Sequence, residues 1–131
     1  MILLDTHAWI WFLSDPGLIS QKAIELVEKA VHNNAVYISS ISIWEIALLV
    51  AKKRLILKIE ISEWISKAER LRFFQFLPVD NSIALKSVNL PQPLHSDPAD
   101  RIIIASALAL DVPLITRDEK ILNYPYVQSV W

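Results

Sequence analysis

Short apolar runs alternate with longer segments of helical periodicity along this chain. The opening MILLD and the later VYIS, at 36–39, have the length and apolar content of buried strands. The segment THAWIWFL predicts a helix that begins at Asp5 or Thr6, and apolar residues spaced by three and four positions predict an amphipathic helix over 20–32. A strand followed by a helix therefore forms the first unit of the fold.

The second half of the chain repeats this alternation. From Ser42 the run IWEIALLVAKKR is apolar on nearly all sides before its basic end, which predicts a buried helix. Asp97 is a suitable N-cap, and Pro98 a suitable first residue, for the apolar helix that continues to Leu110. The other predicted elements are a helix over 62–73, a strand over 74–80, a helix over 81–88, a proline-rich loop over 90–96, and strands over 112–116 and near 126–130.

Strands and helices that alternate in this way form a parallel sheet with helices on both faces. Ligands of such α/β proteins bind in the crevice beyond the carboxyl ends of the strands. The chain has 131 residues and contains no internal repeat and no glycine- or serine-rich linker. We therefore expect one domain that spans residues 1–131.

Glycine and cysteine counts exclude several kinds of site. With only one glycine, Gly17, the chain cannot form a phosphate-binding GxxxxGK[ST] loop or a dinucleotide-binding GxGxxG turn. Without cysteine it has no disulfide, thiolate nucleophile or Cys-ligated metal, so any metal must be held by oxygen or imidazole. The N-terminus lacks signal-peptide features, and the apolar stretch 35–51 is short for a bilayer span and contains Glu45. We expect a cytoplasmic protein that does not enter a membrane.

Five acidic residues are the candidates for chemistry: Asp5, Glu45, Asp97, Asp100 and Asp118. Taken singly, each aspartate could be only a helix N-cap, as we expect of Asp80, and Glu45 could form a capping box with Ser42. Taken together, carboxylates that converge repel one another unless a cation holds them, and such oxygen ligands suit Mg²⁺ or Mn²⁺. With these five set aside, 13 basic and nine acidic residues leave the rest of the chain with a charge of +4.

Other residues have weaker claims to a functional role. Thr6 and Thr116 stand next to two of the acids and are candidates to support them. The basic run Lys52, Lys53 and Arg54 is either a solvated helix end or a contact for RNA phosphates. The two histidines and four tryptophans nearest these motifs are more simply structural residues: His7, His95, Trp9, Trp11, Trp44 and Trp64.

Four segments resemble the successive motifs of PIN-domain ribonucleases, specifically VapC-like toxins of type II toxin–antitoxin pairs. The segments are LLDTHAWIWFL, SSISIWEIALL, HSDPADRIIIASAL and LITRDEKIL, and their order and spacing cover nearly the whole chain. The family's four acidic positions fall on Asp5, Glu45, Asp100 and Asp118, and Asp97 acts as a supporting acid. Ala99 stands where the motif often has a large aromatic residue.

The resemblance implies a three-layer α/β/α sandwich and endonucleolytic RNA cleavage that depends on Mg²⁺ or Mn²⁺. Asp5, Asp100 and Asp118 would hold the metal, with Glu45 completing the site directly or through water. The ion would activate a water and neutralise charge on the phosphodiester in the transition state. The implied partners are an RNA substrate, a co-expressed antitoxin and a second copy of the chain.

An alternative interpretation is a phospho-accepting domain that resembles a receiver. Such a domain has an acidic pair after its first strand and a phosphorylated aspartate after its third, here at best Asp80. The sequence offers Asp5-Thr6-His7, without a second acid beside Asp5, and His7 also departs from the DxD motif of haloacid-dehalogenase-like phosphatases. A binding module that retains the fold without catalysis is a third alternative, but the complete acidic set disfavours it.

Overall fold

Five parallel strands form one sheet in the order β3-β2-β1-β4-β5, so the first strand of the chain lies at its centre. The computed structural model describes all residues, 1–131. In chain order the strands are β1 Ile2–Leu4, β2 Val36–Ser39, β3 Phe74–Leu77, β4 Leu114–Ile115 and β5 Ser129–Val130. Leu4 of β1 pairs with Ile38 on one side and with Ile115 on the other.

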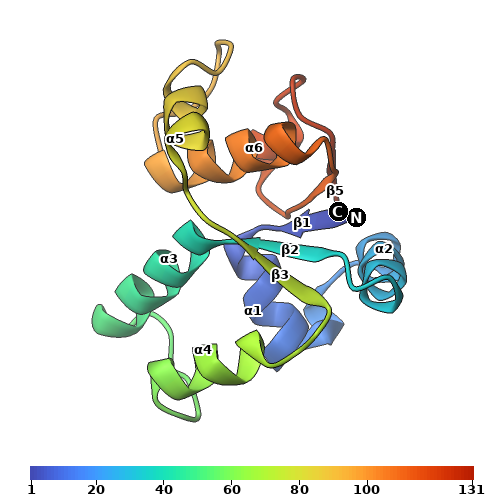
Figure 1. Cartoon of the computed structure of the whole chain (residues 1–131), viewed down its shortest axis with the longest axis vertical. Coiled ribbons are helices and arrows are strands. Elements are labelled where there is room, and N and C mark those ends of the chain that lie inside the picture. Colours follow the sequence, from blue (N-terminus) through green and yellow to red (C-terminus); the bar gives the residue numbers. More distant parts are fainter.

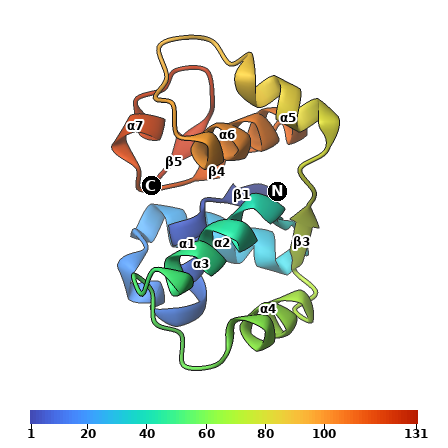
Figure 2. The same ribbon diagram turned by 90° about the vertical axis from the view of Figure 1, so that its left-hand side faces the viewer.

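Seven α-helices and one short 3₁₀ helix cover the sheet. They are α1 Thr6–Ser14, η1 Pro16–Leu18, α2 Gln21–His32, α3 Ser40–Ala51, α4 Ile61–Glu69, α5 Asn81–Val88, α6 Pro98–Leu110 and α7 Glu119–Leu122. Helices α1 to α4 lie on one side of the sheet and α5 to α7 on the other, as the two views show (Figures 1 and 2). This arrangement confirms the expected α/β/α sandwich with a parallel sheet.

The central strand contributes to the core on both faces. Ile2 and Leu4 belong to the cluster under α1 and α2, whereas Leu3 belongs to the cluster under α6 and α7. All three side chains are almost fully buried, and burying a side chain of this size contributes about 1.5–3 kcal/mol. A strand buried on both faces has no polar position before its end, which explains why the first polar residue, Asp5, directly follows it.

The strand order changes direction at β1, so successive strands are added first on one side of β1 and then on the other. From β1 it proceeds outward to β2 and β3 on one side, and then returns through α5 and α6 to β4 on the other side of β1. The carboxyl ends of β1 and β4 therefore border the crevice in which α/β proteins bind their ligands. Asp5 directly follows β1 and Thr116 directly follows β4, so both residues lie at this crevice.

Several elements of the structure differ from the predicted ones. Helix α3 begins at Ser40 with Ser39 as its N-cap, because β2 passes into it without a loop. Helix α4 covers Ile61–Glu69 rather than 62–73, since the chain turns at 70–73 to enter β3. The short helices η1 and α7 were not predicted, because elements of three or four residues are too short to produce an apolar period.

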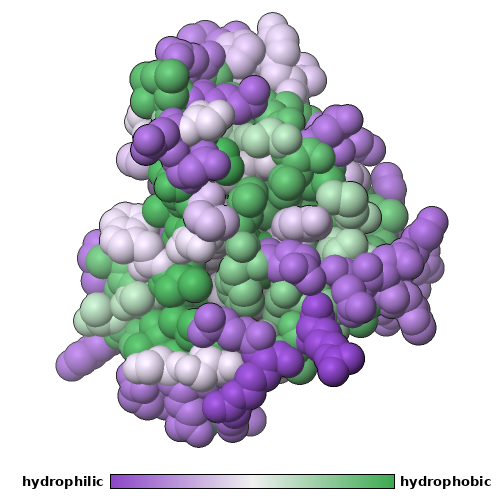
Figure 3. Space-filling model, in the orientation of Figure 1, coloured by the Kyte–Doolittle hydropathy of each residue, from purple (hydrophilic) through white to green (hydrophobic).

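Helix α3 is also less buried than its apolar sequence predicts. Only Ser42 and Ile46 are buried among its residues, and Trp44 is 55% exposed. Hydrophobic side chains accordingly reach the surface over α3 in Figure 3, while the surface over α2 is largely hydrophilic. The helices described are all too short or too polar to cross a membrane.

Candidate active site

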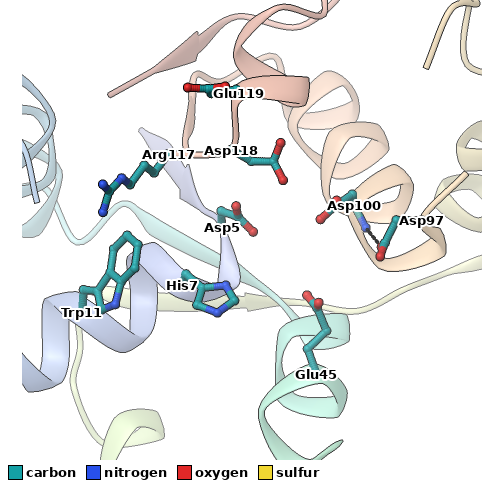
Figure 4. A pocket seen from close by; sticks show the side chains of 9 residues that line it. All are labelled: Asp5, His7, Trp11, Glu45, Asp97, Asp100, Arg117, Asp118 and Glu119. Carbon is teal, nitrogen blue, oxygen red and sulfur yellow. Dashed lines mark hydrogen bonds between the residues drawn. The ribbon is translucent and has the colours of Figure 1, made fainter. Parts of the chain in front are cut away.

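A cavity of about 510 Å³ opens at the crevice beside β1 and β4. All five acidic candidates line it, although they come from four separate segments of the sequence. Figure 4 shows the carboxylates of Asp5, Glu45, Asp100 and Asp118 directed toward one space. The complete lining consists of Asp5, His7, Trp11, Glu45, Asp97, Asp100, Arg117, Asp118 and Glu119. The structure thus brings together the acids that the sequence singled out.

Asp5 is held at the centre of the cavity by hydrogen bonds to both of its carboxylate oxygens. Its Oδ1 accepts from the backbone N–H of Thr6 at 2.7 Å, which caps α1, and its Oδ2 accepts from the Thr116 hydroxyl at 2.7 Å. Only 7% of Asp5 is exposed, and Thr116 is fully buried. The Asp5 side chain is therefore fixed in place, and it caps α1 and lines the cavity at the same time.

Glu45 projects into the cavity from the second turn of α3. Its Oε1 accepts from the Thr6 hydroxyl at 2.5 Å, and the Oγ atoms of Thr6 and Ser42 lie 2.8 Å apart. Since the Thr6 hydroxyl has only one proton, Ser42 donates to Thr6 and Thr6 donates to Glu45. The capping box between Ser42 and Glu45 is therefore wrong: Ser39 is the cap, and the carboxylate turns away from the start of the helix.

Asp97 and Asp100 have different roles at the start of α6. Asp97 caps the helix, because its Oδ1 accepts from the backbone N–H of Asp100 at 3.0 Å. The Asp100 carboxylate is free of such backbone bonds and extends into the cavity (Figure 4). Its Oδ2 lies 2.7 Å from Nε2 of His95, in the loop that precedes the helix. His95 thus orients this carboxylate, a contact that the sequence did not reveal.

Asp118 joins the cavity from the segment that follows β4. Its backbone N–H donates to the Thr116 hydroxyl at 3.1 Å, and its Oδ1 caps α7 by accepting from Lys120 N at 2.8 Å. Thr116 therefore links Asp118 to Asp5, since the same hydroxyl donates to the Asp5 carboxylate. Both threonines that were predicted to support the acids make such contacts.

Burial and mutual repulsion disfavour the charged forms of these acids. Burial is the largest cause in each case, and it raises the pKa of Asp5, the pKa of Glu45 to about 7 and the pKa of Asp100 to about 6. Neighbouring carboxylates raise the pKa values further, and the hydrogen bonds from Thr116, Thr6 and His95 partly offset the effect. Closely placed carboxylates with raised pKa values are typical of sites that bind a cation or a proton.

The donor set suits Mg²⁺ or Mn²⁺. No three of the carboxylate and imidazole groups lie close enough together to ligate one ion as they stand. Mg²⁺ does not need a complete protein cage, because it usually keeps several waters and binds through one or two carboxylates together with phosphate oxygens of a substrate. The fixed carboxylate of Asp5, with Asp100 and Asp118 directed to the same space, fits this mode of binding.

The cavity also contains residues that sequence analysis did not assign to it. Trp11 and His7 reach it from α1, and the Arg117 guanidinium lies 5.9 Å from the centre of the Trp11 ring. Trp11 follows His7 by four positions, which places both on one face of the helix, so the i, i+4 spacing could have revealed this pair. Arg117 and Glu119 had no such signal, because their positions depend on how the chain leaves β4.

The basic run after α3 divides between two surfaces. Lys52 and Arg54 line a groove that borders the acidic cavity, whereas Lys53 lines a separate apolar depression. The chain turns at Lys53, which has a φ of 58°, so Lys53 lines a different surface from Lys52 and Arg54.

Asp80, the acid expected only to cap a helix, does so by accepting from Ile83 N and is not part of the cavity. The receiver interpretation relied on Asp80 as the phosphorylated residue, and Asp80 lies outside the cavity that the other acids line, so the structure does not favour it.

Known proteins resemble this chain in sequence and in fold. The chain matches the PIN domain family over residues 2–125. It is 32% identical over 133 residues to the protein named ribonuclease VapC22 of Mycobacterium tuberculosis (strain ATCC 25618 / H37Rv), with 99% of this chain and 98% of that protein covered. Its fold is similar to a structure of VapBC2 from Rickettsia felis bound to a promoter DNA fragment, with a TM-score of 0.72, 19% identity, and 100% and 99% of the two chains covered. It is also similar to FitAcB from Neisseria gonorrhoeae, with a TM-score of 0.67, 23% identity, and 100% and 97% covered.

Proposed function

Because this chain belongs to the PIN-domain family, as a VapC-like ribonuclease, we propose that residues 1–131 act as a single metal-dependent endoribonuclease domain and as the toxin of a toxin–antitoxin pair. The observation that carries the proposal is the convergence of Asp5, Glu45, Asp100 and Asp118 on one cavity at the crevice beside β1 and β4. The reaction is hydrolysis of an RNA phosphodiester bond by water.

Asp5, Asp100 and Asp118 would hold Mg²⁺ or Mn²⁺, with Glu45 as a further ligand, either directly or through water. When bound, the ion supplies an activated water and neutralises the negative charge that develops on the phosphodiester oxygens. Glu45 and Asp100, whose pKa values are raised, would be stabilised in their ionised forms by a bound cation.

The protein contributes a rigid arrangement of these carboxylates. Thr116 and the Thr6 backbone fix Asp5, and the Thr6 hydroxyl fixes Glu45. Thr6 therefore holds two of the four acids in place. His95 orients Asp100 on the opposite wall. Because no side chain has to form a covalent bond to the substrate, the absence of cysteine is consistent with this mechanism.

The proposed protein partners are an antitoxin and a second copy of the chain. The fold is also similar to a structure described as a toxin–antitoxin complex from Klebsiella pneumoniae, with a TM-score of 0.65 and 24% identity, which motivates the antitoxin. Exposed apolar side chains on α5, Leu85 and Val88, provide surface for the association of two copies. Light scattering at tens of micromolar tests the dimer, because a dimer of about micromolar affinity is populated in that range. A monomer at these concentrations would argue against it.

Sequencing of RNA ends after brief expression in cells that lack the antitoxin tests the proposed nuclease. Wild type is expected to create new RNA ends at specific positions, whereas Asp5→Asn is expected to create none while accumulating as folded protein. Asp80→Asn is the matched control, because it removes a charge from a helix cap outside the cavity, where asparagine caps equally well. The same ends in wild type and Asp5→Asn would refute the proposal.

A further inference from the structure

A groove of about 320 Å³ runs beside the acidic cavity. Glu45 and Asp97 line both the cavity and the groove, so the two are continuous. Trp44, Pro98 and Ala99 provide apolar surface in the groove. Ala99 lacks the large side chain that would narrow the groove at this point. A substrate that extends beyond the acidic cavity on this side therefore meets this surface next.

Trp44 is the exposed aromatic residue of this groove. It is 55% exposed, whereas Trp9 of α1 is fully buried, so Trp44 does not serve the core. It precedes Glu45 by one position, and the side chains of consecutive helical residues point about 100° apart around the helix axis. The Trp44 ring therefore lies next to the acidic cavity but does not line it. Its exposed ring is therefore accessible to a ligand that occupies the groove.

Lys52 and Arg54 supply positive charge at the end of this groove. Both are exposed, and neither takes part in a salt bridge, since the only two in the structure are Glu63–Lys67 and His95–Asp100. The two cations are thus free to pair with an anionic ligand. The acidic cavity lies at the opposite end of the groove, where Glu45 and Asp97 form the shared wall.

We propose that this groove binds a nucleotide adjacent to the scissile phosphodiester of a single-stranded RNA, with its base stacked on Trp44 and its phosphate paired with Lys52 and Arg54. The inference rests on the proposed function, since it places the flanking nucleotide relative to the site of cleavage. Stacking on an aromatic ring requires an unpaired base, which selects single strands over duplexes.

Charge and size favour this occupant over a protein segment. An apolar helix docked on Trp44 would bury Lys52 and Arg54 without partners, which is unfavourable. A groove of about 320 Å³ is at the lower end of the range for small-molecule sites, which suits one nucleotide better than a helix. RNA satisfies both features, because its base is flat and apolar on its faces while its backbone is anionic.

The first test removes the base and the ring separately. Cleavage rates are measured on an RNA oligonucleotide with one defined cut site, and on versions that are abasic at either nucleotide next to the cut. For wild type, one of the two abasic positions is expected to slow cleavage by about 5- to 150-fold, which corresponds to the free energy of stacking a single base. Trp44→Ala is expected to slow cleavage of the intact RNA similarly and to be insensitive to that abasic position, and Trp44→Phe is expected to retain most of the sensitivity.

Tyr126→Ala is the matched control, because Tyr126 is 52% exposed but lines neither the cavity nor the groove. It is expected to respond to the abasic RNA as wild type does. An equal abasic effect in Trp44→Ala and wild type would overturn the stacking role. Normal RNA cleavage by Trp44→Ala, combined with loss of antitoxin binding or of the dimer, would overturn the proposal in favour of a protein partner.

The second test measures RNA binding without cleavage, which separates this inference from the proposed nuclease. Binding of a labelled single strand to Asp5→Asn is followed by fluorescence anisotropy across a range of salt concentrations. Adding Lys52→Gln or Arg54→Gln is expected to lower the slope of log affinity against log salt by about 0.7 each, the value for one phosphate contact on a single strand. Lys58→Gln, which removes an exposed charge outside the groove, is expected to leave the slope unchanged. An unchanged slope in Lys52→Gln and Arg54→Gln would overturn the phosphate contact even if wild type cleaves RNA.

Discussion

Asp100→Asn is expected to stabilise the metal-free protein while it abolishes cleavage. Asp100 is 18% exposed, and burial together with repulsion from Asp5, Asp97 and Asp118 raises its pKa from 3.8 to about 6. Raising the pKa by about 2 corresponds to about 3 kcal/mol of unfavourable free energy when Asp100 is ionised in the folded state. Asparagine has nearly the same shape and carries no charge, so it approximates the protonated acid.

The sign of this effect depends on pH. Because the folded-state pKa is above the unfolded-state value, ionised Asp100 destabilises the fold fully at pH 8, less as the pH falls through about 6, and not at all below about 3.8. Part of the gain is lost in the variant, since asparagine makes a weaker bond to His95 than a carboxylate does. We therefore expect Asp100→Asn to be more stable by about 1–3 kcal/mol at pH 8 and about equal to wild type near pH 4.

Urea unfolding in EDTA at the two pH values measures this difference. Asp80→Asn is the control, because Asp80 is exposed and outside the cavity, and its stability is expected to change little at either pH. Adding Mg²⁺ at pH 8 is expected to stabilise wild type more than Asp100→Asn, since a ligand stabilises the state that binds it. The reasoning is refuted if Asp100→Asn is less stable than wild type at pH 8, or if its gain is the same at pH 8 and pH 4.

Three further predictions follow from the same geometry. Asp97→Ala is expected to lower the free energy of unfolding by about 0.5–2 kcal/mol in denaturant titrations while retaining metal-dependent cleavage, because Asp97 acts as an N-cap; loss of metal binding in this variant would reverse the assignment. The cleavage rate is expected to rise with pH through about 6 to 7 at limiting Mg²⁺, because the proposed metal ligands Asp100 and Glu45 would bind the ion in their ionised forms; a rate that does not change between pH 5 and pH 8 would contradict this. Thr6→Val is expected to raise the pKa of Glu45 by removing its hydrogen bond, and so to move this pH profile upward, which the same rate measurements check; an unmoved profile would mean that Thr6 has no such role.

Most of the fold could be predicted because its signals are local in the sequence. β1 is apolar at every position, and α2 has a regular period with a serine cap, so neither depends on distant residues for its identity. The caps at Asp97 and Asp118 also follow from local sequence. The exposure of Trp44 could not be predicted, because an apolar helix predicts burial but does not reveal which of its faces other elements cover.

The acids of the site could be identified from the sequence, but the contacts that support them could not. Asp5 and Asp118 stand at strand ends, which a parallel sheet brings to one edge. The bond between Thr6 and Glu45 joins residues 39 positions apart, and the bond between Thr116 and Asp5 joins residues 111 positions apart. Such contacts depend on how α1, α3 and β4 meet at the crevice, and no local pattern encodes that.

Cleavage of a defined single-stranded RNA by purified protein, with and without divalent metal, tests the central claim most directly. The protein is first treated with EDTA, and the rate is then measured after addition of Mg²⁺, of Mn²⁺ or of neither. Wild type is expected to cleave with either ion and to be inactive without them, while Asp5→Asn remains folded by circular dichroism and inactive throughout. Cleavage at the same rate without divalent metal, or by Asp5→Asn, would contradict the account.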